Sequence, residues 1–98
     1  GADQDHRAEV RLWLRLLAQA RTRLAKAGLQ LPETAPPRQM AAQAEARFGP
    51  SAQAVRDWLL KLEAQRYAPA SPTSLAALRA EFRRLDWPVA KSVHQSAR

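Results

Sequence analysis

The sequence predicts an all-α fold, a compact bundle of four helices with the third helix at its centre. Hydrophobic residues make up 46% of the 98 residues, mostly as Ala and Leu, and the chain has only three Gly and few β-branched residues. This composition favours helices over sheet, and a chain of this length forms one small domain. Apolar residues recur three and four positions apart between breaks that contain Pro or Gly. We expect helices at about residues 6–27, 36–48, 51–67 and 72–86.

The expected single helical domain covers residues 6–88. Residues 1–5 are polar and start with Gly. They are expected to be a disordered or tag-derived N-terminus, and the chain is interpreted as part of a longer protein. Residues 89–98 show no apolar periodicity, which predicts a flexible tail.

The first expected helix has one clear apolar face. Trp13, Leu17 and Leu24 fall on this face at helical spacing and are expected to lie in the core. Asp5 is the expected N-cap, because its carboxylate can accept a hydrogen bond from a free N–H group of the first turn. Gly28 is expected to end the helix, since Gly adopts the left-handed conformation common after a helix.

The second expected helix is short and begins near Pro36, because Pro is tolerated in the first turn of a helix. Phe48 is expected on its inner face, and Gly49 separates it from the next helix. The fourth expected helix is capped by Ser71, which Pro72 follows.

The last expected helix carries a regular apolar stripe that includes Leu78 and Phe82, both expected in the core. Pro88 is expected to end this helix at Trp87, because a residue before Pro is displaced from the α region.

The third expected helix carries two apolar stripes, which is why we place it at the centre. The larger stripe consists of Val55, Trp58, Leu59 and Leu62, all expected in the core. The smaller one, on nearly the opposite side, consists of Leu60, Ala64 and Tyr67, and Tyr67 is also expected in the core. A surface helix of a small domain usually has one such stripe. Two stripes therefore predict neighbouring helices on both flanks.

Residue types that carry chemistry are sparse, so we expect no enzymatic activity, metal site or cofactor in this chain. Cysteine is absent, and His6 and His94 sit near the two ends without partners at fixed spacing. Carboxylates occur singly, and the sequence has no Gly-rich phosphate loop. No apolar run approaches the roughly 18 residues of a membrane span.

The charge balance indicates an anionic partner. The chain has 16 Lys and Arg against 9 Asp and Glu, a net charge of +7, which suits an acidic protein, an anionic membrane surface or nucleic acid, although a merely solvated surface has the same composition. Arg7, Arg11 and Arg15 lie four residues apart and so form a line along the first expected helix. These three are candidate membrane-facing or partner-binding residues.

Three further residues are candidates for partner binding. Arg21 and Arg66 fall within the apolar arcs of their helices. Each either packs its stem and pairs its guanidinium within the fold, or presents the guanidinium in a groove. Trp87 either covers the edge of the core or is exposed for contact.

A helix-turn-helix motif formed by the second and third expected helices is the alternative functional hypothesis. Gly49 would lie in the turn, and Gln53 and Arg56 would face DNA bases. Glu45 stands where the motif favours a small buried residue, and Asp57 would face the phosphates. DNA is therefore the less favoured partner.

The order of several segments resembles a known bacterial domain, the C-terminal helical domain of unknown function in TgpA-like, membrane-anchored transglutaminase-like proteins. The resemblance extends from about Arg11 to Leu85. The segments that carry it are Arg11–Trp13, Leu24–Leu29, Pro32–Thr34 with Pro36, Leu62–Pro69 and Leu75–Arg79.

This resemblance implies a non-catalytic domain on the cytoplasmic face of the bacterial inner membrane, tethered by a transmembrane helix that precedes it. The transglutaminase-like Cys-His-Asp site of such proteins belongs to a separate domain. The implied role is protein interaction or regulation beside the membrane, with an unidentified cytoplasmic protein as partner and weak contact with anionic lipid. A basic segment fits this setting, because cytoplasmic segments near membrane helices carry excess Lys and Arg. The sequence does not predict the oligomeric state.

Overall fold

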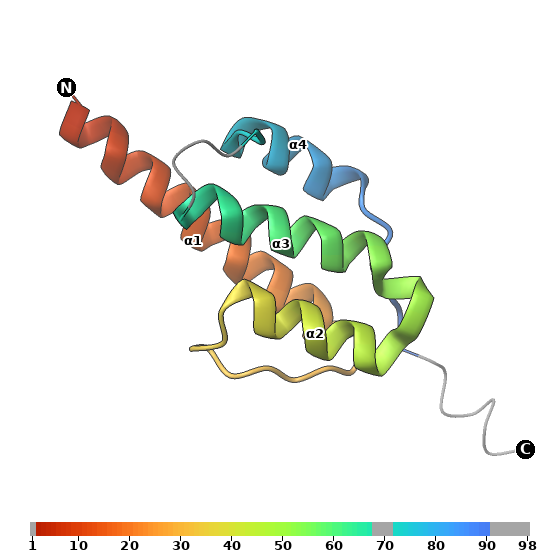
Figure 1. Cartoon of the computed structure of the whole chain (residues 1–98). Helices are drawn as coiled ribbons and strands as arrows, with labels where there is room; N and C mark the ends of the chain where they lie inside the picture. Colours follow the sequence, from red (N-terminus) through yellow and green to blue (C-terminus); the bar gives the residue numbers. More distant parts are fainter. Residues whose placement is uncertain (1, 68–71, 91–98) are drawn as a thin grey trace, which may run out of the picture.

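The structure, a computed structural model, describes residues 2–67 and 72–90. This part of the chain contains helices and no strands. The elements are α1 (Ala2–Lys26), α2 (Pro37–Phe48), the 3₁₀ turn η1 (Gly49–Ala52), α3 (Gln53–Tyr67) and α4 (Leu75–Arg84). Figure 1 shows α3 between α2 and α4, and α1 contacts each of the other three helices. The described residues thus form the compact all-helical fold that the sequence predicts.

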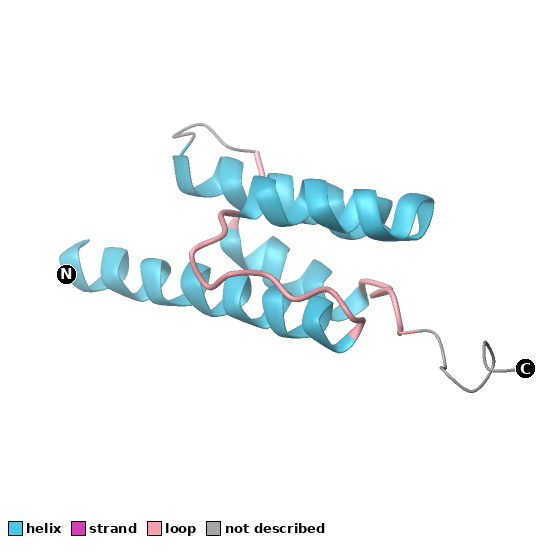
Figure 2. Cartoon of the chain, turned by 90° about the horizontal axis from the view of Figure 1, so that it is seen from below, coloured by secondary structure: helices cyan, strands magenta, loops and turns pink. Residues whose placement is uncertain are grey.

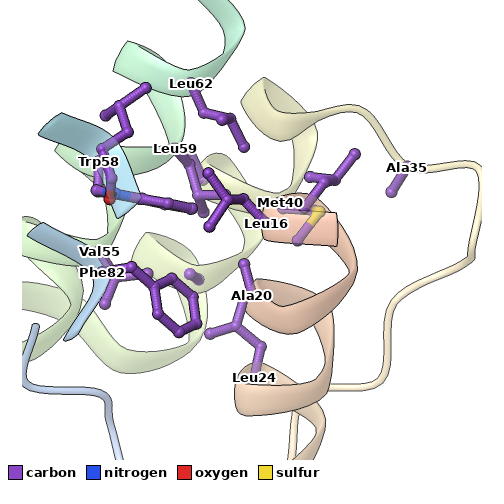
Figure 3. Packing of buried hydrophobic residues seen from close by; sticks show 14 of the residues in the cluster. Leu16, Ala20, Leu24, Ala35, Met40, Val55, Trp58, Leu59, Leu62 and Phe82 are labelled. Carbon is purple, nitrogen blue, oxygen red and sulfur yellow. The ribbon is translucent and has the colours of Figure 1, made fainter. Parts of the chain in front are cut away.

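The core consists almost entirely of apolar side chains from all the helices (Figure 3). No polar or charged residue among the described residues is fully buried. Nine of the expected core residues are buried: Trp13, Leu17, Leu24, Val55, Trp58, Leu59, Leu62, Leu78 and Phe82. The buried set also includes Leu16, Ala20, Met40, Ala41 and Ala44. The small side chains of α2 allow its backbone to pack closely against α3.

Two buried tryptophans join pairs of helices by hydrogen bonds as well as by packing. Trp13 of α1 donates from Nε1 to the carbonyl of Leu62 in α3 over 2.7 Å. Trp58 of α3 donates in the same way to the carbonyl of Leu78 in α4 over 2.9 Å. A carbonyl oxygen has two lone pairs, so it can accept both the helix bond and the indole bond. Each indole N–H is thereby satisfied in the apolar interior.

Gly28 ends the first helix, as expected. Its φ is 99°, a left-handed conformation that Gly adopts without the steric cost of a Cβ. The Leu29 amide donates to the Leu24 carbonyl and the Gly28 amide donates to the Ala25 carbonyl, which is the Schellman arrangement of a helix end. The loop that follows runs back along α1 (Figure 2).

The start of α1 differs from the expectation. The helix begins at Ala2 and not near residue 6, so residues 2–5 are helical and Asp5 lies inside the first turn, not at the N-cap. A carboxylate in the first turn stabilises the positive end of the helix dipole. Charge in the first turn therefore favours extending the helix over capping it at Asp5.

The starts of α2 and α3 are shifted by one and two residues. Pro36 is the N-cap of α2 and has an extended backbone, and Pro37 is the first helical residue. Glu63 of α3 accepts a hydrogen bond from the Arg38 amide over 3.2 Å, which supplies the cap that Pro36 lacks. The turn η1 includes residues 51 and 52, which were expected to belong to α3, so α3 begins at Gln53.

The fourth helix is shorter than expected at both ends. Its N-cap is Ser74, whose hydroxyl accepts a hydrogen bond from the Ala77 amide over 3.1 Å. The predicted cap, Ser71, lies outside the described residues. The helix ends at Arg84, and Leu85 is extended with ψ 140°. The pre-proline residue Trp87 lies beyond the helix, in a segment without regular secondary structure.

Two expected core residues are not fully buried. Tyr67 is 71% exposed, because it is the last residue of α3 and lies on the helix side that faces solvent. Leu60, on the same side, is 44% exposed. The second stripe of α3 is thus a surface feature, and α3 meets its neighbours through one wide apolar face. Phe48 is half-buried at the end of α2 and packs against the core from its edge.

Of the predicted tail, residues 89 and 90 have no regular secondary structure. Residues 91–98, including His94, lie outside the described part of the chain.

Candidate functional site

The side chains around α4 separate into three groups. Leu75, Leu78 and Phe82 face the core. Glu81 faces α3, where its carboxylate pairs with Lys61 Nζ at 3.3 Å. Arg79 and Arg83 lie together on the flank towards α1, because residues four apart share one side of a helix.

A groove runs between α1 and α4. It consists of two adjoining hollows of about 500 Å³ and about 610 Å³, which share Leu12, Arg79 and Arg83. The larger hollow is also lined by Ala8, Glu9, Leu75, Ala76 and Ala80. The other is also lined by Arg15, Leu16, Ala18, Gln19, Thr22, Arg23, Lys26 and Phe82. We call these two hollows together the basic groove.

Five cationic side chains line the basic groove: Arg15, Arg23, Lys26, Arg79 and Arg83. Glu9, at one end, is the only carboxylate among its described lining residues. The ion pairs within the described residues involve Arg56 and Lys61 and none of these five. The groove therefore holds concentrated positive charge that the described part of the fold does not neutralise.

Apolar groups lie at the bottom of the basic groove. Leu12 is half-buried against the core, and Phe82 is almost fully buried beneath the cations. The Arg23 guanidinium lies over the Phe82 ring at 5.9 Å from its centroid, a cation–π contact that holds this charge at the α1–α4 junction. A ligand in this groove would meet an apolar floor between two cationic walls.

The structure places Arg15 in a different environment from Arg7 and Arg11. Arg15 lines the basic groove. Arg7 and Arg11 are exposed on the N-terminal half of α1 and do not line it. The first turns of the helix extend beyond the other helices (Figure 1). An α-helix turns by 100° per residue, so residues four apart drift around the axis by about 40° per step.

Arg21 is held within the fold. Its Nη2 donates to the backbone carbonyl of Glu33 over 2.9 Å, which ties the loop after α1 to that helix. Arg47 of α2 supports the same loop by donating to the Gly28 carbonyl over 3.3 Å. These contacts match the structural interpretation of Arg21.

Arg66 and Trp87 also pack against aromatic rings. The Arg66 guanidinium lies 5.5 Å from the centroid of the Trp13 ring and borders a small hollow of about 110 Å³ with His6 and other residues. Trp87 is half-buried, with its ring centroid 5.1 Å from that of Phe82 and 6.4 Å from that of Trp58. Trp87 thus covers the edge of the core.

The residues of the helix-turn-helix hypothesis are differently engaged. Gln53 is exposed. Arg56, which would contact bases, pairs through Nη1 with Glu45 at 2.9 Å and through Nη2 with Asp57 at 2.9 Å. The hydrogen bond with Asp57, followed by the charge of Glu45, raises the pKa of Arg56 above its usual value. To contact DNA, Arg56 would have to leave both carboxylates.

Sequence reasoning did not identify four of the five groove cations, namely Arg23, Lys26, Arg79 and Arg83. The four-residue spacing of Arg79 and Arg83, beside the regular apolar stripe of the last expected helix, indicates that the two side chains share one flank of that helix. The sequence did not show that α1 is the helix that this flank approaches.

Other kinds of site are not apparent in the described residues. No cluster of His, Asp and Glu within residues 2–67 and 72–90 could hold a metal ion. Among the helices described, none combines the length and apolar character needed to cross a bilayer. Comparison with known proteins found no matching family model, no matching curated protein and no matching solved structure.

Proposed function

We propose that this chain is a non-catalytic protein-interaction module, a four-helix bundle organised around α3. The observation that carries the proposal is the basic groove, where five cations surround an apolar floor without an ion pair among the described residues. Concentrated charge of one sign destabilises a fold and attracts partners of opposite charge. An apolar floor adds area that a binding protein can bury.

The proposed setting is the cytoplasmic face of the bacterial inner membrane, as part of a TgpA-like, membrane-anchored transglutaminase-like protein. This part of the proposal rests on the segment resemblance and on the basic character of α1 as a whole, which carries six Lys and Arg against three Asp and Glu. Arg7 and Arg11 are exposed there, where each could gain about 1 kcal/mol near an anionic leaflet. Two such contacts give weak adsorption, which suits a domain already held at the membrane by another segment.

The test is affinity capture from nuclease-treated bacterial cytoplasm and membranes, with the whole chain as bait. The wild-type chain and an Arg84→Glu control should capture the same set of proteins, because Arg84 is exposed on α4 and does not line the groove. The double variant Arg79→Glu, Arg83→Glu should lose that set. Capture of lipid alone, or a protein set unaffected by the double variant, would contradict the proposal.

A further inference from the structure

We infer that the basic groove binds an acidic amphipathic α-helix of a partner protein, about three turns long. This inference rests on the proposed function as an interaction module and names the chemistry of the partner. Its basis is the length of the two walls, the position of the cations along them and the apolar socket between them.

The length of α4 limits the contact. The ten residues of α4 extend about 15 Å at roughly 1.5 Å per residue. On α1, the lining residues run from Ala8 to Lys26, and these 18 steps correspond to about 27 Å at the same rise. A partner helix that lies between the two walls would therefore contact the shorter wall, α4, over about ten residues.

The cations fit carboxylates spaced along a helix. Arg79 and Arg83 are four residues apart, so their Cβ atoms lie about 6 Å from one another on one side of α4. Carboxylates four residues apart on a partner helix have the same spacing. Arg can bind a carboxylate through two N–H groups at once, which gives strong and directional pairing. Arg15 and Lys26 offer the same charge on the opposite wall.

The larger hollow provides a socket for an apolar side chain. Leu12 is flanked there by Ala8, Ala76 and Ala80, and these three alanines are exposed. Small side chains leave room for a larger one from a facing helix, as a knob enters a hole between helices. A Leu on the apolar stripe of the partner would fill this space and bury Leu12.

Other occupants match these features less well. A bilayer surface is broad and flat, so it would meet the rim of a groove and not its floor. Nucleic acid phosphates would use the cations but not the apolar socket. Residues 89–98 of this chain contain no Asp or Glu and carry Lys91 and Arg98, so their side chains have the wrong charge to pair with the groove. A second copy would bring a net charge of +7 towards another.

The experiment uses the whole chain and a fluorescein-labelled helical peptide of about 14 residues. The peptide carries Leu at positions i, i+3 or i+4, and i+7, the pattern of a groove-binding helix, with Glu on both flanks of that stripe. A control peptide has the same composition and charge, but its Leu residues are distributed around the helix. We expect the control peptide to bind at least about tenfold more weakly in fluorescence anisotropy, a difference that corresponds to about 1.4 kcal/mol.

Two pairs of variants separate charge from shape. Arg79→Glu with Arg83→Glu should weaken binding at least about tenfold, and the control Arg84→Glu, a single charge reversal on the same helix, should change it less than about twofold. Ala80→Leu should fill the socket and weaken binding without a change in charge. Ala77→Leu, at an exposed position of α4 outside the groove, is its matched control. All five positions are exposed, and circular dichroism verifies that each variant folds.

The outcomes distinguish this inference from the proposed function. If the peptide does not bind, or if both peptides bind equally, an acidic amphipathic helix is not the occupant. The proposed function would still hold if the Arg79→Glu, Arg83→Glu variant lost its captured proteins. Stronger binding of DNA duplexes or phosphatidylglycerol vesicles than of the peptide, abolished by the same variant, would overturn both.

Discussion

Trp58 and Trp87 contact the same Phe82 ring, but their indole N–H groups have different surroundings. Trp58 is completely buried and donates to the Leu78 carbonyl. The Trp87 Nε1 atom is also buried, yet it has no hydrogen-bond partner among the described residues. A buried donor without an acceptor costs stability, whereas a satisfied one contributes about 1 kcal/mol.

The pair predicts losses of stability of different size for the same Trp→Phe substitution. Trp58→Phe removes a hydrogen bond and leaves a cavity in the core, so we expect a loss of about 2 to 3 kcal/mol in the free energy of unfolding. Trp87→Phe removes an unsatisfied donor from a half-buried position, so its loss should be below about 1 kcal/mol. Urea denaturation of both variants measures the difference. Equal losses would show that packing alone determines the contribution of these rings.

The residue-scale predictions from sequence succeeded where a side chain lay in the middle of a helix face. Spacing alone placed Trp13, Trp58 and Leu62 in the core. It failed at Tyr67, whose spacing relative to Leu60 and Ala64 looked equally regular. Regular spacing shows that residues share a helix side, but it does not show whether another helix covers that side.

At the scale of elements, α1 has two parts with different environments. From Ala8 onwards it lines the basic groove, and from Trp13 onwards it contributes buried residues to the core. The side chains from Gln4 to Glu9 are exposed, and neither Arg7 nor Arg11 lines the groove. These two residues can therefore be changed without altering the groove.

The membrane-facing role of α1 can be tested separately. Sedimentation with phosphatidylglycerol vesicles at low salt should capture part of the wild-type chain, because each Arg near the surface contributes about 1 kcal/mol. Arg7→Glu with Arg11→Glu should reduce capture severalfold, whereas Arg38→Glu on the start of α2 should have a smaller effect. Neutral phosphatidylcholine vesicles provide the baseline. Capture that is unchanged by the double substitution would exclude this part of α1 as the lipid contact.

The sequence predicted the helices better than their arrangement. Each helix contains an apolar stripe, and Gly28 and Gly49 mark helix ends by their backbone freedom. For α4, Ser71 and Ser74 both precede residues that can begin a helix. The observed N-cap is Ser74, directly before the buried Leu75. The basic groove was not predictable in this way, because it depends on how α1 and α4 are rotated against one another.

At the scale of the whole molecule, positive charge exceeds what the described ion pairs neutralise. Five cations line one groove, and the net charge is +7. The ion pairs of Arg56 and Lys61 involve partly exposed side chains, and such pairs contribute little to stability. Repulsion should therefore outweigh attraction among the surface charges.

This imbalance predicts that salt stabilises the chain. Raising NaCl from about 0.01 M to 0.15 M shortens the Debye length from roughly 30 Å to 8 Å. Weaker repulsion should raise Tm by about 2 to 5 °C, since about 1 kcal/mol corresponds to roughly 4 to 8 °C in a domain of this size. Arg79→Gln with Arg83→Gln should show a smaller salt effect. A Tm that falls with salt would mean that ion pairs dominate.

The uninterrupted helix from Ala2 to Lys26 has a mechanical consequence. A continuous α-helix is stiff, because every turn is linked to the next by backbone hydrogen bonds. The first turns of α1 and the part of the same helix that carries Arg15, Arg23 and Lys26 therefore move as one rigid rod. A twist applied near Gln4 would rotate these cations relative to Arg79 and Arg83, and it would widen or narrow the groove without any change inside α4.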